Sequence, residues 1–92
     1  MTEESTIVAT PQIHMNGTGR DSLLREVNTA IDALRVAQQA VYNMTIHKRD
    51  YYILEDGDAV FELAWKQGTE RNVKIRDVLS DLEAYRVNLL TQ

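Results

Sequence analysis

The sequence predicts an all-α protein: an antiparallel two-helix hairpin, with helices at about 19–44 and 58–90 and a short extended arm before them. Two observations predict this fold class. In each segment apolar residues recur at alternating spacings of three and four, which places them on one face of a helix, as in a coiled coil. The only proline, Pro11, precedes both segments, so neither pattern contains a residue that breaks helices.

The segment 58–90 carries the longer pattern, and Asp58 is expected to cap it because aspartate is favoured at helix N-caps. At about 1.5 Å per residue, this helix would be roughly 45–50 Å long. A chain of 92 residues buries only a modest core. We therefore expect uncovered apolar surface and self-association into an oligomeric helical bundle. The predicted apolar face consists of Phe61, Ala64, Gly68, Arg71, Ile75, Val78, Leu82, Tyr85 and Leu89.

Two residues on this face, Gly68 and Arg71, are not apolar side chains, and each allows two interpretations. Glycine inside a helix costs about 1 kcal/mol relative to alanine, so Gly68 indicates either the close approach of another helix or room for a ligand. Arg71 either extends its stem along the surface and pairs with a carboxylate of a partner helix, or binds an anion within a cleft. The sequence leaves both alternatives open.

The segment 19–44 has the more regular apolar face. Thr18 and Asp21 have the spacing of a capping box, which predicts the start of the helix. Leu24 and Ile31 widen the apolar stripe to one side, so two partners are expected: the second helix, and either an arm or a neighbouring subunit. The face itself is formed by Leu23, Val27, Ala30, Leu34, Ala37, Val41 and Met44.

The chain is expected to form a single domain, with a partly disordered tail at 1–10 and an extended arm ending in a turn at 11–18. The pattern allows short strands at 5–9 and 12–15, which would need a helix face or a second subunit for stability.

The Asn-Gly-Thr-Gly run at 16–19 favours a tight turn and a helix cap. The alternative is an anion site, in which backbone N–H groups at a helix N-terminus act together with Arg20. In that case Asn16 and Thr18 supply polar contacts to the ligand.

The connection at 45–57 is longer than the roughly 2–8 residues usual between packed helices. It contains His47, Lys48, Arg49, Tyr51 and Tyr52. In one interpretation the tyrosines and Ile53 pack over the end of the hairpin, and Arg49 pairs with Asp50 or Glu55. In the other, Arg49 binds an anion and a tyrosine stacks on a flat group, as recognition of a nucleotide requires.

Composition excludes several classes of function. Without cysteine the chain has neither a disulfide nor a thiol nucleophile. A net charge of -4 argues against nucleic acid as a partner, because phosphate contacts need a basic face. No apolar run approaches the roughly 20 residues that span a membrane, and no signal peptide is recognisable. We therefore expect a cytoplasmic protein without a membrane partner.

No catalytic or metal motif stands out. His14 and His47 are too far apart in sequence to form a spacing motif, and surface or capping roles explain them. The acidic residues Glu55, Asp56 and Asp58 lack the residue order of a calcium loop. We therefore expect a protein that is not an enzyme and needs no cofactor.

Two short motifs resemble those of a group of small phage-encoded proteins. The run Ile-His-Met-Asn-Gly-Thr at 13–18 is similar to an I-H-x-N-G-T start, and Arg-Asp-Tyr-Tyr at 49–52 is similar to an R-D-Y-Y centre. The resemblance covers most of 13–90 and implies a phage origin, a location in the host cytoplasm and two helical segments. The chain departs from this group after Tyr52, where Ile-Leu-Glu stands in place of a proline-containing turn.

Together these features predict a non-catalytic, homo-oligomeric binding protein that sequesters a small anionic ligand, such as a signalling nucleotide, and so counters a host defence. The ligand would bind at a subunit boundary. The predicted ligand-binding residues are Asn16, Thr18, His47, Arg49, Tyr51, Tyr52 and Arg71. The alternative is a protein-interaction module that docks on a host or virion protein through its helical face and Arg-Tyr-Tyr loop, since Tyr and Arg are favoured at interaction hot spots.

Overall fold

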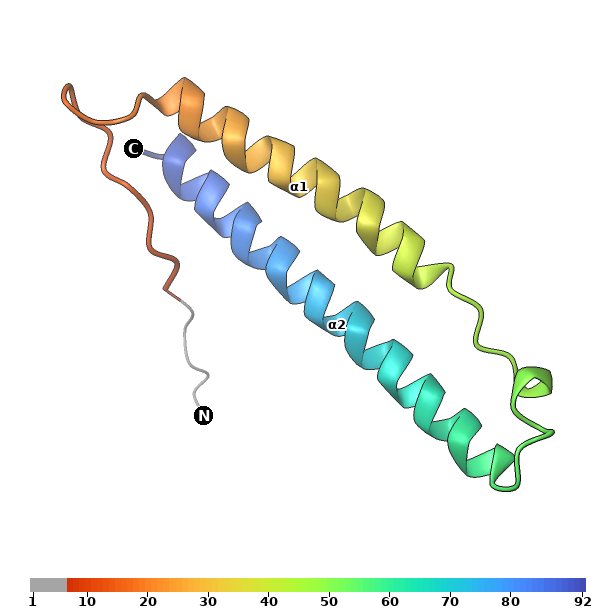
Figure 1. Ribbon diagram of the computed structural model, residues 1–92. Coiled ribbons are helices and arrows are strands. Elements are labelled where there is room, and N and C mark those ends of the chain that lie inside the picture. The colour runs from red at the N-terminus through yellow and green to blue at the C-terminus, as the bar shows by residue number, and fades with distance from the viewer. Residues whose placement is uncertain (1–6) are drawn as a thin grey trace.

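The computed structural model describes residues 7–92, and these form an antiparallel hairpin of two helices (Figure 1). Helix α1 spans Arg20–Tyr42 and helix α2 spans Gly57–Leu90. The loop between them contains one short 3-10 helix, η1, at Lys48–Asp50. The molecule measures 64 × 33 × 16 Å, so it is a single layer of two helices. The predicted all-α hairpin is confirmed, and each helix boundary lies within two residues of its predicted position.

The arm before α1 has no regular secondary structure in its described part. The strand predicted at 12–15 is absent, and the described part of the one predicted at 5–9 is also irregular. The first six residues of the predicted tail lie outside the described residues.

Neither helix is capped as the sequence predicts. Helix α1 begins after Gly19, whose extended backbone makes it the N-cap without a side-chain hydrogen bond, so Thr18 and Asp21 do not form a capping box. Helix α2 begins one residue earlier than expected, with Asp56 at the N-cap. Asp58 instead lies in the first turn, where its negative charge is favourable at the positive end of the helix dipole. It also faces Lys48, with 3.6 Å between Oδ1 and Nζ.

The hydrophobic core lies in the half of the hairpin where α1 begins and α2 ends, which we call the terminal half (residues 7–34 and 75–92). Five side chains are buried there: Leu23, Val27, Ile31, Leu79 and Leu89. Half-buried Ile13, Leu24, Leu34, Ile75, Leu82 and Tyr85 pack around them. The rest of the hairpin, the loop half (residues 35–74), contributes no apolar side chain to the core described for residues 7–92.

The buried face of α2 is rotated relative to the predicted one. Leu79 has an exposed fraction of 7%, whereas the predicted Val78 is 47% exposed. In the same way Asn72 is half-buried and Arg71 is exposed. The predicted row through Arg71 and Val78 and the observed row through Asn72 and Leu79 have the same alternating spacing. Spacing alone therefore does not show which row is buried. The side on which α1 crosses α2 decides which row is buried.

In α1 the predicted Leu23 and Val27 are buried, and the buried face also extends to the edge of the predicted stripe. Ile31, expected at the edge of the stripe, is only 1% exposed and is the most buried residue of the helix. Ala37 and Met44, expected on the face, are exposed. Leu24 likewise packs against the core, so both stripe-widening residues serve the α1–α2 contact within one chain.

The arm is held against the C-terminal end of α2 by the side chain of Gln92. Its Nε2 donates to the Pro11 carbonyl at 2.6 Å, and its Oε1 accepts from the Ile13 N–H at 2.8 Å. Asn88 adds a hydrogen bond to the Thr10 hydroxyl at 3.1 Å. Ile13 is thereby placed on the core, which gives the terminal half a third packed segment.

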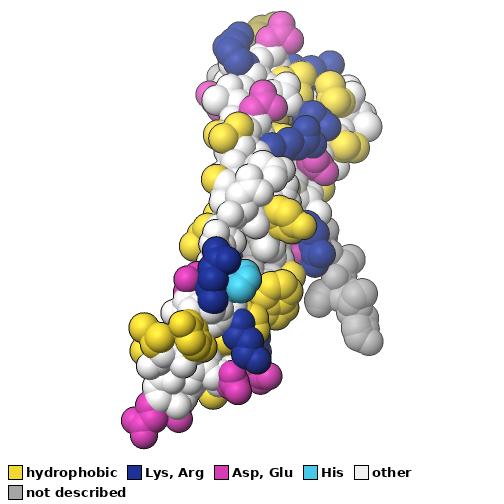
Figure 2. Space-filling model, turned by 90° about the vertical axis from the view of Figure 1, so that its right-hand side faces the viewer, with side chains coloured by type: hydrophobic (Ala, Val, Ile, Leu, Met, Phe, Trp, Pro, Cys, Tyr) yellow, Lys and Arg dark blue, Asp and Glu magenta, His cyan; other side chains and the backbone are white. Residues whose placement is uncertain are grey.

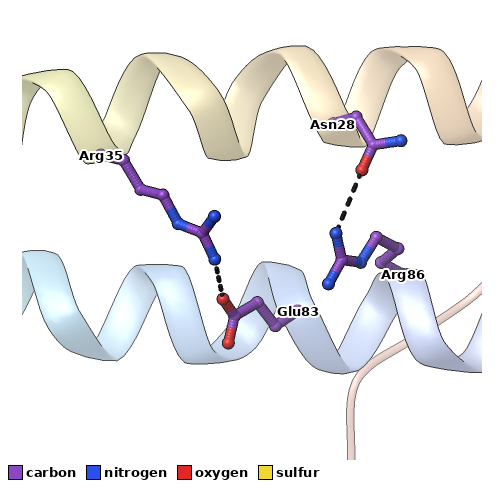
Figure 3. Close-up of polar contacts among 4 residues, drawn as sticks. All are labelled: Asn28, Arg35, Glu83 and Arg86. Atoms are coloured by element: carbon purple, nitrogen blue, oxygen red, sulfur yellow. Dashed lines mark hydrogen bonds and ion pairs between the residues drawn. The ribbon is translucent and has the colours of Figure 1, made fainter.

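Two polar contacts cross from α1 to α2 (Figure 3). Arg35 Nη2 lies 2.6 Å from Glu83 Oε2, and Arg86 Nη1 donates to Asn28 Oδ1 at 3.4 Å. All four side chains point into the gap between the helices from its rim. Because exposed ion pairs contribute only about 0–1 kcal/mol, these contacts favour one register but leave most of the stability to the apolar core.

Replacing Ile31 with alanine is expected to lower the free energy of unfolding by about 2–5 kcal/mol, because it removes a buried side chain and leaves a cavity. Urea denaturation followed by circular dichroism measures the change. The matched control is Val36→Ala in the same helix, at a position that is 73% exposed, where we expect a change within about 0.5 kcal/mol. Equal effects of the two substitutions would contradict the assigned core.

Candidate functional site

The loop half exposes most of the large apolar side chains of its segment. These include Tyr42, Met44, Tyr52, Ile53, Leu54, Leu63 and Trp65. Figure 2 shows the end of the molecule that carries the loop, in the lower part of the view, where apolar, basic and histidine side chains lie next to one another. Monomeric proteins rarely expose a large continuous apolar surface unless it binds something. This half is therefore the candidate functional region.

Two contacts fix the path of the loop. The Nδ1 atom of His47 accepts a hydrogen bond from the Arg49 N–H at 3.1 Å, so His47 caps η1. The ring of Tyr51 packs on Phe61, with 6.0 Å between ring centroids and a tilt of 58°. His47 and Tyr51, both predicted to bind a ligand, thus have structural contacts within the chain.

The other predicted loop residues point to solvent. Arg49 is exposed and forms no ion pair within residues 7–92, so the predicted pairing with Asp50 or Glu55 is absent there. Tyr52 is 70% exposed and Ile53 is 79% exposed, so neither packs over the end of the hairpin. Only Tyr51 does so. Arg49, Tyr52 and Ile53 remain available to another molecule.

A cavity of about 390 Å³ opens where α1 ends beside α2. Its wall combines the arginine of the predicted site with two aromatic rings and the apolar start of the loop. It is lined by Val41, Tyr42, Met44, Ile46, Trp65, Gly68, Thr69, Arg71 and Asn72.

Gly68 forms the floor of this cavity beside the loop. A Cβ atom at this position would lie 2.5 Å from Cδ1 of Ile46. The close approach expected at Gly68 is therefore made by a side chain of the loop, where the sequence suggested another helix. Arg71, three residues on, places its guanidinium-bearing side chain at the same cavity.

Asn16 and Thr18 lie far from these residues within one chain. They belong to the arm, at the end of the hairpin where α1 begins, whereas the loop is at the opposite end (Figure 1). In a molecule 64 Å long, a single chain does not bring the two groups together. A pocket containing both requires a second chain, which is where the sequence analysis placed it.

Seven of the nine lining residues were not predicted as site residues, and Tyr42, Trp65 and Asn72 are the ones with aromatic or amide side chains. Asn72 occupies the rotated face of α2, and its Oδ1 atom is buried without a hydrogen-bond partner within the described residues. An unsatisfied buried acceptor costs about 1–3 kcal/mol. No local sequence pattern brings these three residues together, because Tyr42 lies on α1 whereas Trp65 and Asn72 lie on α2.

Several other types of site find no support in residues 7–92. No group of three or more His, Cys, Asp or Glu side chains is arranged to hold a metal ion there. Within the same range, no helix has the length and apolar character to cross a bilayer. No protein-family model matches the chain, and neither a curated protein nor a solved structure similar to it was found.

The two buried glycines of α2 are expected to respond differently to alanine. At Gly57 a Cβ would overlap the backbone carbonyl oxygen of Tyr51 and lie 3.1 Å from Cα of Tyr52, so Gly57→Ala should destabilise the fold by about 1–3 kcal/mol. At Gly68 the obstacle is the end of the flexible Ile46 side chain, and helix propensity favours alanine by about 1 kcal/mol.

Gly68→Ala should therefore be neutral or stabilising. Thermal unfolding followed by circular dichroism compares the two variants with the original chain. A lower melting temperature for Gly68→Ala than for Gly57→Ala would show that the loop packs differently.

Proposed function

We propose that the chain is a non-catalytic binding protein that takes up a small anionic molecule with a flat ring, such as a signalling nucleotide. The observation that carries this proposal is the composition of one cavity wall. Arg71 and the rings of Tyr42 and Trp65 line the same space of about 390 Å³, within the roughly 300–1,000 Å³ typical of small-molecule sites.

The chemistry of these groups suits such a ligand. An arginine guanidinium binds phosphate through two parallel hydrogen bonds. Aromatic rings stack on a nucleobase, with about 1–3 kcal/mol per base. Asn72 adds a polar side chain to the same cavity wall. Arg49 on the neighbouring loop is a further cation without an ion pair within residues 7–92, whereas Lys48 faces Asp58.

The biological role follows from the resemblance to phage-encoded proteins at 13–18 and 49–52. A phage protein that binds a nucleotide without turning it over withholds it from host enzymes or receptors. We therefore place the protein in the host cytoplasm, where it would act by sequestering a signal that triggers host defence. The described residues offer a binding surface for this role, and no catalytic step is needed.

Arg71→Ala is expected to weaken binding of an anionic nucleotide by about 10- to 100-fold, since a hydrogen bond to a charged group contributes about 1.5–3 kcal/mol. Titration calorimetry with a panel of cyclic and linear nucleotides measures the affinity. Lys74→Ala, which removes an exposed cation of the same helix, is the matched control and should bind as the original chain does.

Arg49→Ala tests the loop in the same titration and is expected to weaken binding while leaving helicity unchanged. Absence of heat for the original chain with every nucleotide in the panel would refute the proposal. Recovery of a hydrolysed nucleotide after incubation would instead identify an enzyme.

A second function is favoured by a separate observation at the tip of the loop. Ile53 is 79% exposed and Tyr52 is 70% exposed. They lie close in sequence to Arg49, which forms no ion pair within residues 7–92. Exposed Tyr and Arg at the centre of an apolar patch are typical of protein-interaction hot spots. In this alternative the loop docks on a host or virion protein.

The double substitution Tyr52→Ser and Ile53→Ser should abolish capture of a stoichiometric host protein in a pull-down from lysate, if the loop is the docking element. Nucleotide binding in the Arg71 cavity should be unchanged by it, because neither residue lines that cavity. Capture that persists in the double variant would exclude the loop tip as the docking surface.

A further inference from the structure

Five residues form an exposed row on α2, outside its contact with α1: Glu62, Trp65, Thr69, Val73 and Arg76. Their spacings are three, four, four and three, so they lie on one face of the helix. Glu62 and Arg76 lie seven residues on either side of Thr69, and Trp65 and Val73 lie four residues on either side of it. The two end residues carry opposite charges. An acid stands at one end, a base at the other, and apolar Trp65 and Val73 flank the small central residue.

The surface along this row is hollowed over its whole length. One depression is lined by Phe61, Glu62 and Trp65. The Arg71 cavity continues it past Trp65 and Thr69. A third depression follows, lined by Gln38, Gln39, Tyr42, Thr69, Asn72, Val73 and Arg76. Trp65 lines the first two depressions, and Tyr42, Thr69 and Asn72 line the last two. We refer to this series of neighbouring depressions beside α2 as the groove.

We propose that this groove is a self-docking surface, in which a second copy of the chain lays its own α2 antiparallel to the first across a two-fold axis at Thr69. Antiparallel alignment about residue 69 places Glu62 opposite Arg76 of the second copy. It places Trp65 opposite Val73 of the second copy, and the two Thr69 residues face each other at the axis. Each contact occurs twice, as a two-fold interface requires.

The charges of the row select this arrangement. Neither Glu62 nor Arg76 forms an ion pair within residues 7–92, so both are free for a partner. Antiparallel docking brings opposite charges together at both ends of the row, whereas parallel docking places Glu62 against Glu62 and Arg76 against Arg76. Like charges at an interface disfavour the wrong partner or orientation. The self-complementary pattern thus identifies a second copy as the occupant.

The exposed area supports the same occupant. The chain has an accessible surface of 7083 Å², whereas a folded monomer of 10.5 kDa is expected to expose about 5,400 Å². The excess is roughly 1,700 Å², which is more than the roughly 800 Å² that each partner buries in a standard-size interface. A second layer of helices on this face would convert the two-helix hairpin into a four-helix bundle.

Reversing or exchanging the charges at positions 62 and 76 tests the proposal. Neither residue lines the cavity that contains Arg71. Glu62→Arg and Arg76→Glu, taken singly, should each weaken self-association by about tenfold or more, because each places like charges together twice. The double variant Glu62→Arg with Arg76→Glu exchanges the two charges and should restore association to within a few-fold of the original chain. Sedimentation velocity and native mass spectrometry measure the assembly.

Two controls carry the same changes in charge at exposed positions of α2 outside the row. Glu70→Arg and Lys74→Glu should leave assembly unchanged. An original chain that contains an even number of copies, with rescue by the double variant, supports the interface. A monomer at micromolar concentration, an odd number of copies, or a double variant as defective as the single ones overturns it.

Trp65 provides an independent readout, because it is the only tryptophan of the chain. Its emission should shift to shorter wavelength with rising concentration in the original chain and the double variant, and the shift should be absent in the single reversals. Emission that stays constant while the mass increases places the interface elsewhere and overturns the proposal. These measurements use ligand-free protein, so they stand or fall separately from nucleotide binding.

Discussion

The packing of α1 against α2 around Ile31 and Leu89 is the interaction on which the rest of the structure depends. The molecule is a single layer of two helices, so each helix has one helical neighbour and buries one stripe. Ile31 and Leu89 are the most buried side chains of the core, at 1% and 0% exposed. Every other surface of both helices is left to solvent, to the arm or to another molecule. The faces that stabilise the hairpin are therefore distinct from those that we propose for recognition.

The two ends of the hairpin differ in how far other parts of the chain cover the helices. At the terminal half, Gln92 holds the arm against α2, and Ile13 adds a further apolar contact to the core. At the loop half, the chain provides no such cover. The His47 cap of η1 and the Tyr51–Phe61 contact fix the loop from within. The exposed rings and cations of this end are thus presented by an ordered backbone, which reduces the entropy lost on binding.

The sequence predicts the helices well because their alternating spacing extends over many turns, and a long periodic signal outweighs local ambiguity. It predicts their faces less well. Val78 and Leu79 are both apolar, and only the position of α1 shows that Leu79 is the buried one. The predicted caps at Thr18 and Asp58 were wrong because a favourable residue type does not determine whether its side chain turns back to the backbone. Such choices depend on contacts between residues distant in sequence.

The candidate site shows the same limit. Arg71 and Gly68 stand out from the sequence because each interrupts an apolar face, and both line one cavity. The contact of Ile46 with Gly68 joins a loop to a helix more than twenty residues away, and no local pattern predicts it. For the same reason Tyr42, Trp65 and Asn72 were missed, since they meet only where the end of α1 crosses α2.

The groove and the cavity share Trp65, so self-docking and ligand binding are not independent in the assembled protein. A second copy seated along Glu62 to Arg76 would lie over the part of the cavity wall formed by Trp65 and Thr69, and would leave Arg71 on the far side of Gly68. A ligand held by Arg71 then contacts a wall whose outer surface is protein rather than water. Lower solvent access strengthens the attraction between a guanidinium and a phosphate. Assembly would raise affinity in this way even if the second copy touched no atom of the ligand, and by reciprocity the ligand would favour assembly.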